Sequence, residues 1–140
     1  MGERTRFSEE VLRMIERIES VTAEGRRLTL VLAFNYSARR EMVLAARALA
    51  ERVASGELRA EDIDEADFAN ALMSRGIPDP DFVIRTSGEC RLSNFLLWQS
   101  SYAELYFPEV LWPDFGEEEF ERAMEEYARR ERRYGLVTEE

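Results

Sequence analysis

The chain has 140 residues, of which 45% are hydrophobic, and it carries a formal net charge of -10. It contains neither histidine nor lysine, so arginine supplies all 19 basic residues. These absences exclude imidazole acid–base chemistry, Schiff bases and histidine-ligated zinc. The negative charge argues against nucleic acid as a partner, because such a surface needs clustered positive charge.

The length and the apolar runs predict a single domain over residues 1–140 that works in the cytoplasm. No apolar run approaches the roughly 20 residues that span a bilayer, and the N-terminus lacks the apolar core of a signal peptide. We therefore expect membrane association to be peripheral at most. The single cysteine, Cys90, cannot form an internal disulfide, which agrees with a reducing compartment.

The first predicted element is an amphipathic helix from Ser8 to about Thr22. Ser8 is a suitable N-cap, and Gly25 is a suitable stop. The residues that recur at helical spacing are Phe7, Val11, Met14, Ile15, Ile18 and Val21. The apolar run LTLVLAF, residues 28–34, then shows no helical stripe. It predicts a strand that is covered on both faces in a parallel sheet.

Two further helices follow this strand in the sequence. The first is predicted over residues 37–56, after a turn that begins at Asn35. Its expected apolar face consists of Met42, Ala45, Ala46, Leu49 and Val53. The next is indicated by Asp64 as N-cap and by Gly76 as its end, while Ile63 and Phe68 can form a hydrophobic staple at its start.

The second half begins with a linker and a second buried strand. The segment IPDPD, residues 77–81, predicts a rigid linker to the strand over residues 82–85. A helix is expected over residues 93–99, and a last helix from Glu117 to about Arg133. The last helix carries acidic residues in its first turn and arginines in its last turn, which suits the helix dipole.

This alternation predicts an α/β fold, part of a mostly parallel sheet flanked by helices, with a right-handed crossover. Two strands are fewer than the roughly 4 to 6 strands of a usual sheet. We therefore expect either that further strands are hidden in irregular sequence or that the chain is part of a larger sheet.

Two arginines and a serine gather where the second strand ends. Ligands of open α/β sheets bind beyond the carboxyl ends of the strands, and Arg85 occupies such an end. A glycine permits a tight turn before Arg91, and Ser93 can cap the next helix. Two guanidinium forks, a hydroxyl and the N–H groups of a helix start would form a site for a doubly or triply charged anion, such as a diphosphate. The alternative is that the arginines pair with Glu89 or Asp81 while Ser93 only caps.

These segments resemble a known family. The run PDFVIRTSGECRLSNFLLWQSSYAELYF, followed by VLWPDF, resembles the C-terminal signature of the cis-prenyltransferases, the undecaprenyl diphosphate synthase family. LTLVLAFNYSARREMV resembles the family's strand and asparagine–tyrosine turn, and RRERRYG its closing arginine-any-glycine motif. The resemblance covers most of the chain. It implies that isopentenyl diphosphate is condensed onto an allylic diphosphate with Mg²⁺ as cofactor.

The resemblance also implies roles for individual residues. By the motif positions, Arg85, Arg91, Ser93 and the backbone around Leu92 would hold the diphosphate of isopentenyl diphosphate. Glu104 would help to place Mg²⁺. Without the resemblance, Glu104 would be interpreted as a solvated carboxylate beside an aromatic strand.

The resemblance further implies a homodimer, in which Arg133 and Gly135 would approach the partner's active site. Arg133 could equally donate hydrogen bonds to the free carbonyl groups at the C-terminal end of its own helix. A dense apolar belt is typical of a core, and in the family this region also forms the dimer interface. The belt consists of Phe95, Leu96, Leu97, Trp98, Tyr102, Leu105, Tyr106, Phe107, Val110, Leu111 and Trp112.

The chain departs from the family at its start. Family enzymes open with an aspartate-glycine-asparagine-glycine-arginine-tryptophan motif that serves the allylic substrate and the metal, and nothing here resembles it. We therefore assign no catalytic residue, and we expect a C-terminal portion that lacks the first strands, the allylic site and most of the product tunnel. A smaller departure is that Ser37 and Ala38 stand where the family commonly has two glycines.

Two hypotheses follow for the function. In the first, the chain is one portion of a cis-prenyltransferase, and turnover requires a complementary N-terminal portion. In the second, it is a non-catalytic subunit that dimerises with a full-length prenyltransferase. The retained arginines, serine and glutamate favour the first, because a scaffold would not need them. A third interpretation is an unrelated anion-binding domain.

Overall fold

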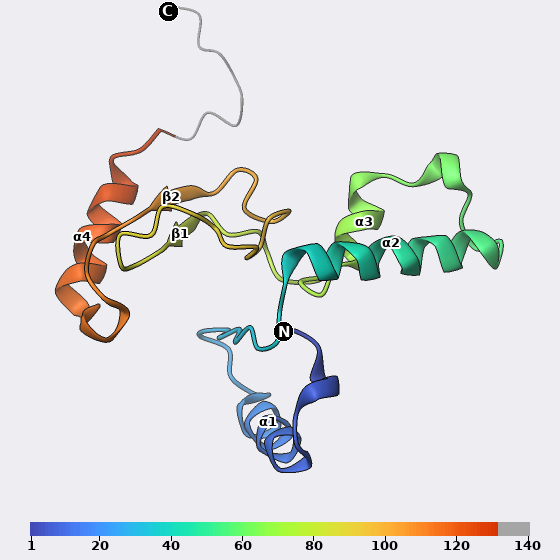
Figure 1. Cartoon of the computed structure of the whole chain (residues 1–140), viewed down its shortest axis with the longest axis horizontal. Coiled ribbons are helices and arrows are strands. Elements are labelled where there is room, and N and C mark those ends of the chain that lie inside the picture. Colours follow the sequence, from blue (N-terminus) through green and yellow to red (C-terminus); the bar gives the residue numbers. More distant parts are fainter. Residues whose placement is uncertain (132–140) are drawn as a thin grey trace, which may run out of the picture. The chain divides into compact units, whose positions relative to one another are not determined.

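The computed structural model describes residues 1–131. They divide into two compact units, Met1–Ile77 and a second unit that begins at Pro78 (Figure 1). The boundary falls inside the segment IPDPD, where the sequence predicts a linker. Short 3-10 helices occur at Arg4–Arg6, Ala60–Asp62 and Trp112–Asp114. No helix within residues 1–131 is long and apolar enough to cross a membrane.

The first unit begins with helix α1, Glu9–Thr22, as the sequence predicts. The Ser8 hydroxyl accepts a hydrogen bond from the Val11 N–H at 3.4 Å, which confirms the predicted N-cap. No residue of α1 is buried, and Met14, Ile18 and Val21 are exposed. The amphipathic pattern therefore predicts the helix correctly, although its apolar face is largely uncovered.

The strand predicted over residues 28–34 is not formed, and this prediction is wrong for the described chain. Most of the segment is exposed, and only its end is paired with the N-terminus. The Met1 amine donates to the Leu32 carbonyl at 2.8 Å, and the Phe34 N–H donates to the Met1 carbonyl at 3.0 Å. A strand needs a neighbour along its whole length to satisfy its backbone groups. Within residues 1–131, this segment has such a neighbour only at its end.

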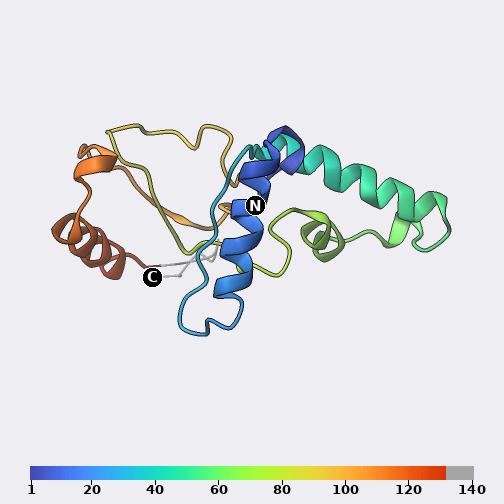
Figure 2. The same ribbon diagram turned by 90° about the horizontal axis from the view of Figure 1, so that it is seen from below.

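Helices α2, Ala38–Ala54, and α3, Glu65–Ala71, pack together in the first unit, and both views show them side by side (Figures 1 and 2). A capping box between Asp64 and Asp67 starts α3, and Arg52 donates to Asp67 Oδ1 at 3.3 Å. Helix α3 ends at Ala71 rather than near Gly76, because Leu72 is already in an extended conformation. The buried apolar side chains of this unit are Ala38, Ala45, Leu49 and Leu72.

Glu41 is a buried carboxylate between these helices. It is fully buried, and its Oε1 accepts a hydrogen bond from the Tyr36 hydroxyl. Its Oε2 accepts a hydrogen bond from the Met73 N–H at 3.1 Å. The carboxylate thus connects the turn before α2 to the segment after α3, and its burial is compensated by hydrogen bonds.

The second unit contains a parallel strand pair and one helix. Strands β1, Phe82–Ile84, and β2, Glu104–Tyr106, pair in parallel with Phe82 opposite Glu104, which confirms the predicted α/β class with parallel strands. Helix α4, Glu117–Ala128, covers one face, where the rings of Phe82 and Tyr127 lie 4.9 Å apart. The predicted first turn of three glutamates is present, but the helix ends at Ala128 and not near Arg133, so the prediction of arginines in its last turn is wrong.

The helix predicted over residues 93–99 is not formed, and the segment consists of turns and bends. Ser93, Asn94 and Leu96 have φ values of 48°, 63° and 45°. Three positive φ values in four residues exclude a right-handed helix. This part of the predicted element order is therefore wrong.

The apolar belt is only partly a core. Tyr102, Leu111 and Trp112 are exposed, while Pro108 is buried among belt residues of intermediate exposure. The ring of Trp112 stacks on that of Phe115, with the centroids 6.2 Å apart. Large exposed aromatic and aliphatic side chains of this kind are typical of surfaces that contact another chain.

We expect Glu41→Ala to lower the free energy of unfolding by about 1–3 kcal/mol more than Glu41→Gln, because alanine removes the acceptor of both hydrogen bonds. The measurement is urea denaturation followed by far-ultraviolet circular dichroism. The control is Glu51→Ala, an exposed position on the same helix, which should change stability by less than about 0.5 kcal/mol. Equal stability of Glu41→Ala and Glu51→Ala would contradict the role of the carboxylate.

The pair of Glu3 and Arg40 makes the stability of the first unit depend on pH. Arg40 Nε and Nη2 donate to the two oxygens of Glu3, each at 3.1 Å. This hydrogen bonding lowers the pKa of Glu3, burial opposes the change, and the charges of Arg40 and Arg6 add to it. A carboxyl group with a lowered pKa stabilises the folded state above its unfolded pKa of about 4.3.

We therefore expect the stability difference between wild type and Arg40→Gln to be constant from pH 7 to pH 5. The difference should shrink as the pH falls below about 4.3 and then through the lowered pKa of Glu3. Protonation of Glu3 breaks its pair with Arg40 in the wild type, whereas the variant has no such pair to lose. Urea midpoints measured across this range test the expectation. A difference that grows on acidification would show that the sign is wrong.

Candidate anion-binding site

Strand β1 delivers Arg85 to the carboxyl end of the strand pair. The Arg85 N–H still donates to the Tyr106 carbonyl at 2.9 Å, so the ladder continues one residue beyond β1. Arg85 Nε is buried and has no hydrogen-bond partner among residues 1–131. A buried donor without an acceptor costs free energy, and an anion bound here would satisfy it.

The turn that follows Arg85 is fixed by the segment after β2. Ser87 and Gly88 have φ values of 70° and 62°, a conformation that glycine adopts without strain. The Ser87 N–H donates to the Val110 carbonyl at 2.8 Å, and the Gly88 N–H donates to the Pro108 carbonyl at 2.9 Å. These two N–H groups already have acceptors, so they are not available to an anion.

Arg91 lies further along the same loop and forms an ion pair with Glu89. The Arg91 side chain is 65% exposed, so this pairing contributes little stability and can be exchanged for another anion. Leu92 is half-buried and Ser93 is exposed. Because no helix begins at Ser93, it does not cap one, and the N–H groups of a helix start are not available there.

Glu104 lies at the opposite end of the strand pair from Arg85. The register places it opposite Phe82, three residues before Arg85, or about 10 Å along the strands. Strand alternation puts Glu104 on the face with Phe82, which α4 covers. Its Oε2 accepts a hydrogen bond from Arg130 Nη1 at 2.9 Å. The strand pair therefore brings Arg85 and Arg91 onto one loop and keeps Glu104 apart from them.

The residues present do not by themselves fit a magnesium centre. Within the described part of the chain, no group of three or more metal-ligating side chains is assembled. Glu104 offers one carboxylate, and Arg130 already binds one of its oxygens. Mg²⁺ requires near-octahedral oxygen coordination, so the other ligands would have to come from water, a diphosphate or another polypeptide segment.

Two predicted residues, Arg133 and Gly135, lie outside the described residues. Two other residues matter more than the sequence analysis suggests. The sequence indicates Glu89 only as an alternative partner for the arginines, and Arg130 only as a charge at a helix end. No local pattern could have identified the partner of Arg130, because Glu104 lies 26 residues away in the sequence.

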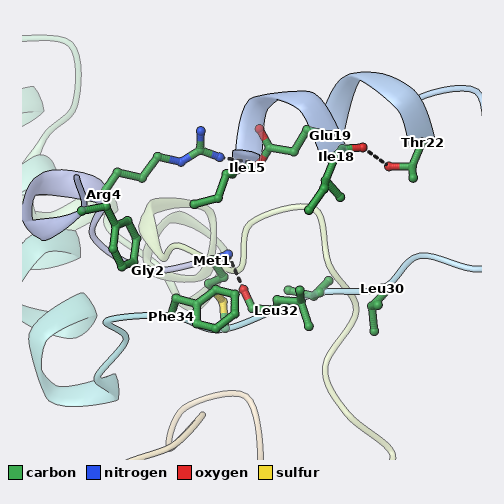
Figure 3. Close-up of a pocket in the computed structure, with 12 residues that line it drawn as sticks. Met1, Gly2, Arg4, Ile15, Ile18, Glu19, Thr22, Leu30, Leu32 and Phe34 are labelled. Carbon is green, nitrogen blue, oxygen red and sulfur yellow. Dashed lines mark hydrogen bonds and ion pairs between the residues drawn. The ribbon is translucent and has the colours of Figure 1, made fainter. Parts of the chain in front are cut away.

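The first unit contains a separate apolar cavity of about 310 Å³ (Figure 3). Ile15 and Ile18 of α1 line it from one side, and Leu30 and Leu32 from another. An ion pair between Arg4 and Glu19 lies among the lining residues. The cavity holds no part of the anion site, and its walls are side chains that the predicted strand over residues 28–34 would have buried.

Comparisons with known proteins give one consistent family. A family model described as "Putative undecaprenyl diphosphate synthase" matches residues 1–135. The chain is 49% identical over 135 residues to an isoprenyl transferase of Zymomonas mobilis, covering 96% of this chain and 54% of that protein. It is 45% identical over 137 residues to a (2E,6E)-farnesyl-diphosphate specific ditrans,polycis-undecaprenyl-diphosphate synthase of Xylella fastidiosa, covering 98% of this chain and 54% of that protein.

A solved structure is also similar. The crystal structure of lavandulyl diphosphate synthase from Lavandula x intermedia, in complex with dimethylallyl diphosphate, has a TM-score of 0.93 at 40% identity. The match covers 97% of this chain and 58% of the other. The chain thus spans a little over half the length of the relatives that it matches.

Proposed function

Since this chain belongs to the undecaprenyl diphosphate synthase family of prenyltransferases, we propose that it serves cis-prenyl chain elongation by binding isopentenyl diphosphate. The diphosphate would be held by Arg85, Arg91 and Ser93 and by the backbone around Leu92. Isopentenyl diphosphate would be condensed onto an allylic diphosphate, whose site would lie on a portion of the family fold that this chain does not match.

The observation that carries the proposal is the buried Nε of Arg85. A guanidinium donor without an acceptor, at the carboxyl end of a parallel strand, favours a negatively charged ligand there. Arg91 lies on the same loop, and its guanidinium can exchange the Glu89 carboxylate for a diphosphate oxygen. Two arginine forks match the several oxygens of a diphosphate better than they match one carboxylate.

The two arginines would act by neutralising and orienting the diphosphate. Fixing the substrate places its reacting carbon against the allylic partner, so that part of the entropic cost of the reaction is met by binding. We propose that Glu104 contributes one carboxylate to Mg²⁺ when further ligands are supplied, and that the metal would neutralise diphosphate charge. The described residues form no metal centre by themselves.

We further propose that the working protein is a cytoplasmic assembly. The partner would be a complementary N-terminal portion, a second copy of the chain, or a full-length prenyltransferase. The exposed belt residues Tyr102, Leu111 and Trp112 support a partner surface. Arg133 and Gly135 would reach across such an interface. A non-catalytic supporting subunit is the second candidate function, and the same exposed surface favours it.

We expect Arg91→Ala to weaken the binding of isopentenyl diphosphate or pyrophosphate by about 1.5–3 kcal/mol, the range for hydrogen bonds to charged groups. Arg85→Lys should also weaken binding, because lysine keeps the charge but loses the planar fork. Isothermal titration calorimetry with and without Mg²⁺ measures both effects. Arg59→Ala is the matched control, because Arg59 is an exposed arginine paired with Glu61 two residues away. Equal affinity of wild type and Arg91→Ala would refute the site.

We expect the 140-residue chain alone to incorporate no radiolabelled isopentenyl diphosphate into farnesyl diphosphate primers. Elongation also requires a second diphosphate site and a dry channel for the product, which we expect on the portion of the family fold that this chain does not match. Activity should return when a polypeptide carrying the family's N-terminal motif is co-expressed, and Arg91→Ala in this chain should remove it again.

Two outcomes would count against this expectation. Product formed by the purified 140-residue chain alone would show that no further portion of the family fold is essential, provided that Arg91→Ala abolishes the product and so excludes a contaminating host enzyme. Restored activity that does not change with Arg91→Ala would favour the non-catalytic supporting subunit instead.

A further inference from the structure

The exposed segment 28–34 pairs with the N-terminus at one end, and this pairing defines an edge of the segment. The Met1 amine donates to the Leu32 carbonyl at 2.8 Å, a bond that Figure 3 draws as a dashed line. The Phe34 N–H donates to the Met1 carbonyl at 3.0 Å. Two bonds of this kind on either side of one residue, here Ala33, are the pattern of a parallel strand pair. The segment therefore accepts a strand-like neighbour along the edge of Leu32 and Phe34.

The rest of this edge is free within residues 1–131. Alternate residues of an extended chain direct their N–H and C=O groups to the same edge, so Leu28 and Leu30 share the edge of Leu32. Neither Leu28 nor Leu30 forms a backbone hydrogen bond in the described part of the chain. They are also 83% and 75% exposed. Both the backbone groups and the apolar side chains of this stretch are thus available to a partner.

The apolar cavity of the first unit lies beside the segment. Leu30 and Leu32 line it together with Ile15 and Ile18 of α1 (Figure 3). Ile18 is 57% exposed although it lines the cavity, so the cavity is open to solvent. An added strand would bring alternate side chains to the face that carries Leu30 and Leu32, where they would fill the cavity. A small apolar molecule could also cover these side chains, but it would leave the backbone edge without hydrogen-bond partners.

We propose that residues 28–32 form a docking edge for an added β-strand, and that this strand belongs to the portion of the family fold that this chain does not match. The chain covers 54% of an isoprenyl transferase and 58% of lavandulyl diphosphate synthase, so these relatives contain polypeptide without a counterpart here. The added strand supplies the neighbour that the apolar run lacks, and it buries leucines that are exposed in this chain. The inference rests on the proposed assembly with a complementary portion, and it names the surface that the assembly uses.

Amide hydrogen exchange followed by nuclear magnetic resonance tests the docking edge. The probe is a polypeptide that comprises the portion of the Zymomonas mobilis isoprenyl transferase that this chain does not match. When the probe is co-expressed with the chain, the amides of Leu30 and Leu32 should exchange at least about tenfold more slowly than in the chain alone, because hydrogen-bonded amides exchange only when they open. Thr29 and Val31 direct their N–H groups to the opposite edge and are the internal reference. Unchanged exchange at Leu30 and Leu32, or equal or greater protection at Thr29 and Val31, would overturn the inference.

Proline substitutions provide an independent test with a matched control. Leu30→Pro removes an N–H group from the docking edge, whereas Thr29→Pro removes one from the opposite edge. Neither N–H donates a backbone hydrogen bond within residues 1–131, so both variants should keep the fold of the chain alone, which circular dichroism verifies. Leu30→Pro should reduce the amount of probe that co-purifies at least about tenfold, and Thr29→Pro should change it less than about twofold. Equal co-purification with both variants would contradict the docking edge. If Leu30→Pro does not fold, the exchange experiment on the wild type decides.

The same measurements separate this inference from the other occupants and from the proposed function. Protection of Leu30 and Leu32 in the chain alone, rising with protein concentration, would assign the edge to a second copy and overturn the inference. If the probe protects the edge but isopentenyl diphosphate does not bind to the assembly, the docking edge stands and the proposed function fails. If activity is restored while Leu30 and Leu32 stay unprotected, the docking edge fails alone.

Discussion

The second unit depends on the backbone hydrogen bonds that join the segment around β1 to the segment around β2. They begin where the Glu104 N–H donates to the Asp81 carbonyl at 2.9 Å and continue beyond the strands to the Gly88 N–H. Three-residue strands are too short to be stable alone. The additional hydrogen bonds of the turn therefore stabilise the strand pair and fix the position of Arg85 at its end. The geometry of the proposed site depends on these bonds.

The predictions that succeeded rest on local chemistry. Ser8 and Asp64 mark helix starts because their side chains bond to N–H groups three residues away, and such signals are complete within a short window. A strand is also predicted over residues 82–85, and the structure forms it over Phe82–Ile84 because β2 provides a neighbour. The position of Arg85 at the end of a parallel strand could therefore be predicted from the sequence.

The predictions that failed depend on distant partners or on backbone strain. Residues 28–34 have the composition of a buried strand, but a strand exists only when its backbone groups are paired. The turns within residues 93–99 require positive φ values at non-glycine residues. The amino-acid composition of the segment does not indicate these φ values. The bond from Arg130 to Glu104 joins residues far apart in the sequence, so it follows from packing and from no local motif.

The location of both tryptophans in the second unit has a spectroscopic consequence. The chain has two tryptophans, Trp98 and Trp112, and both belong to the second unit. Intrinsic tryptophan emission therefore reports on that unit alone, with Trp112 contributing a solvent-exposed, red-shifted component and Trp98 a more shielded one. The first unit has Tyr36 as its only tyrosine, so its folding is nearly silent at tryptophan wavelengths. A quencher such as iodide would separate the two emitters, and the shielded one is only five residues from Ser93.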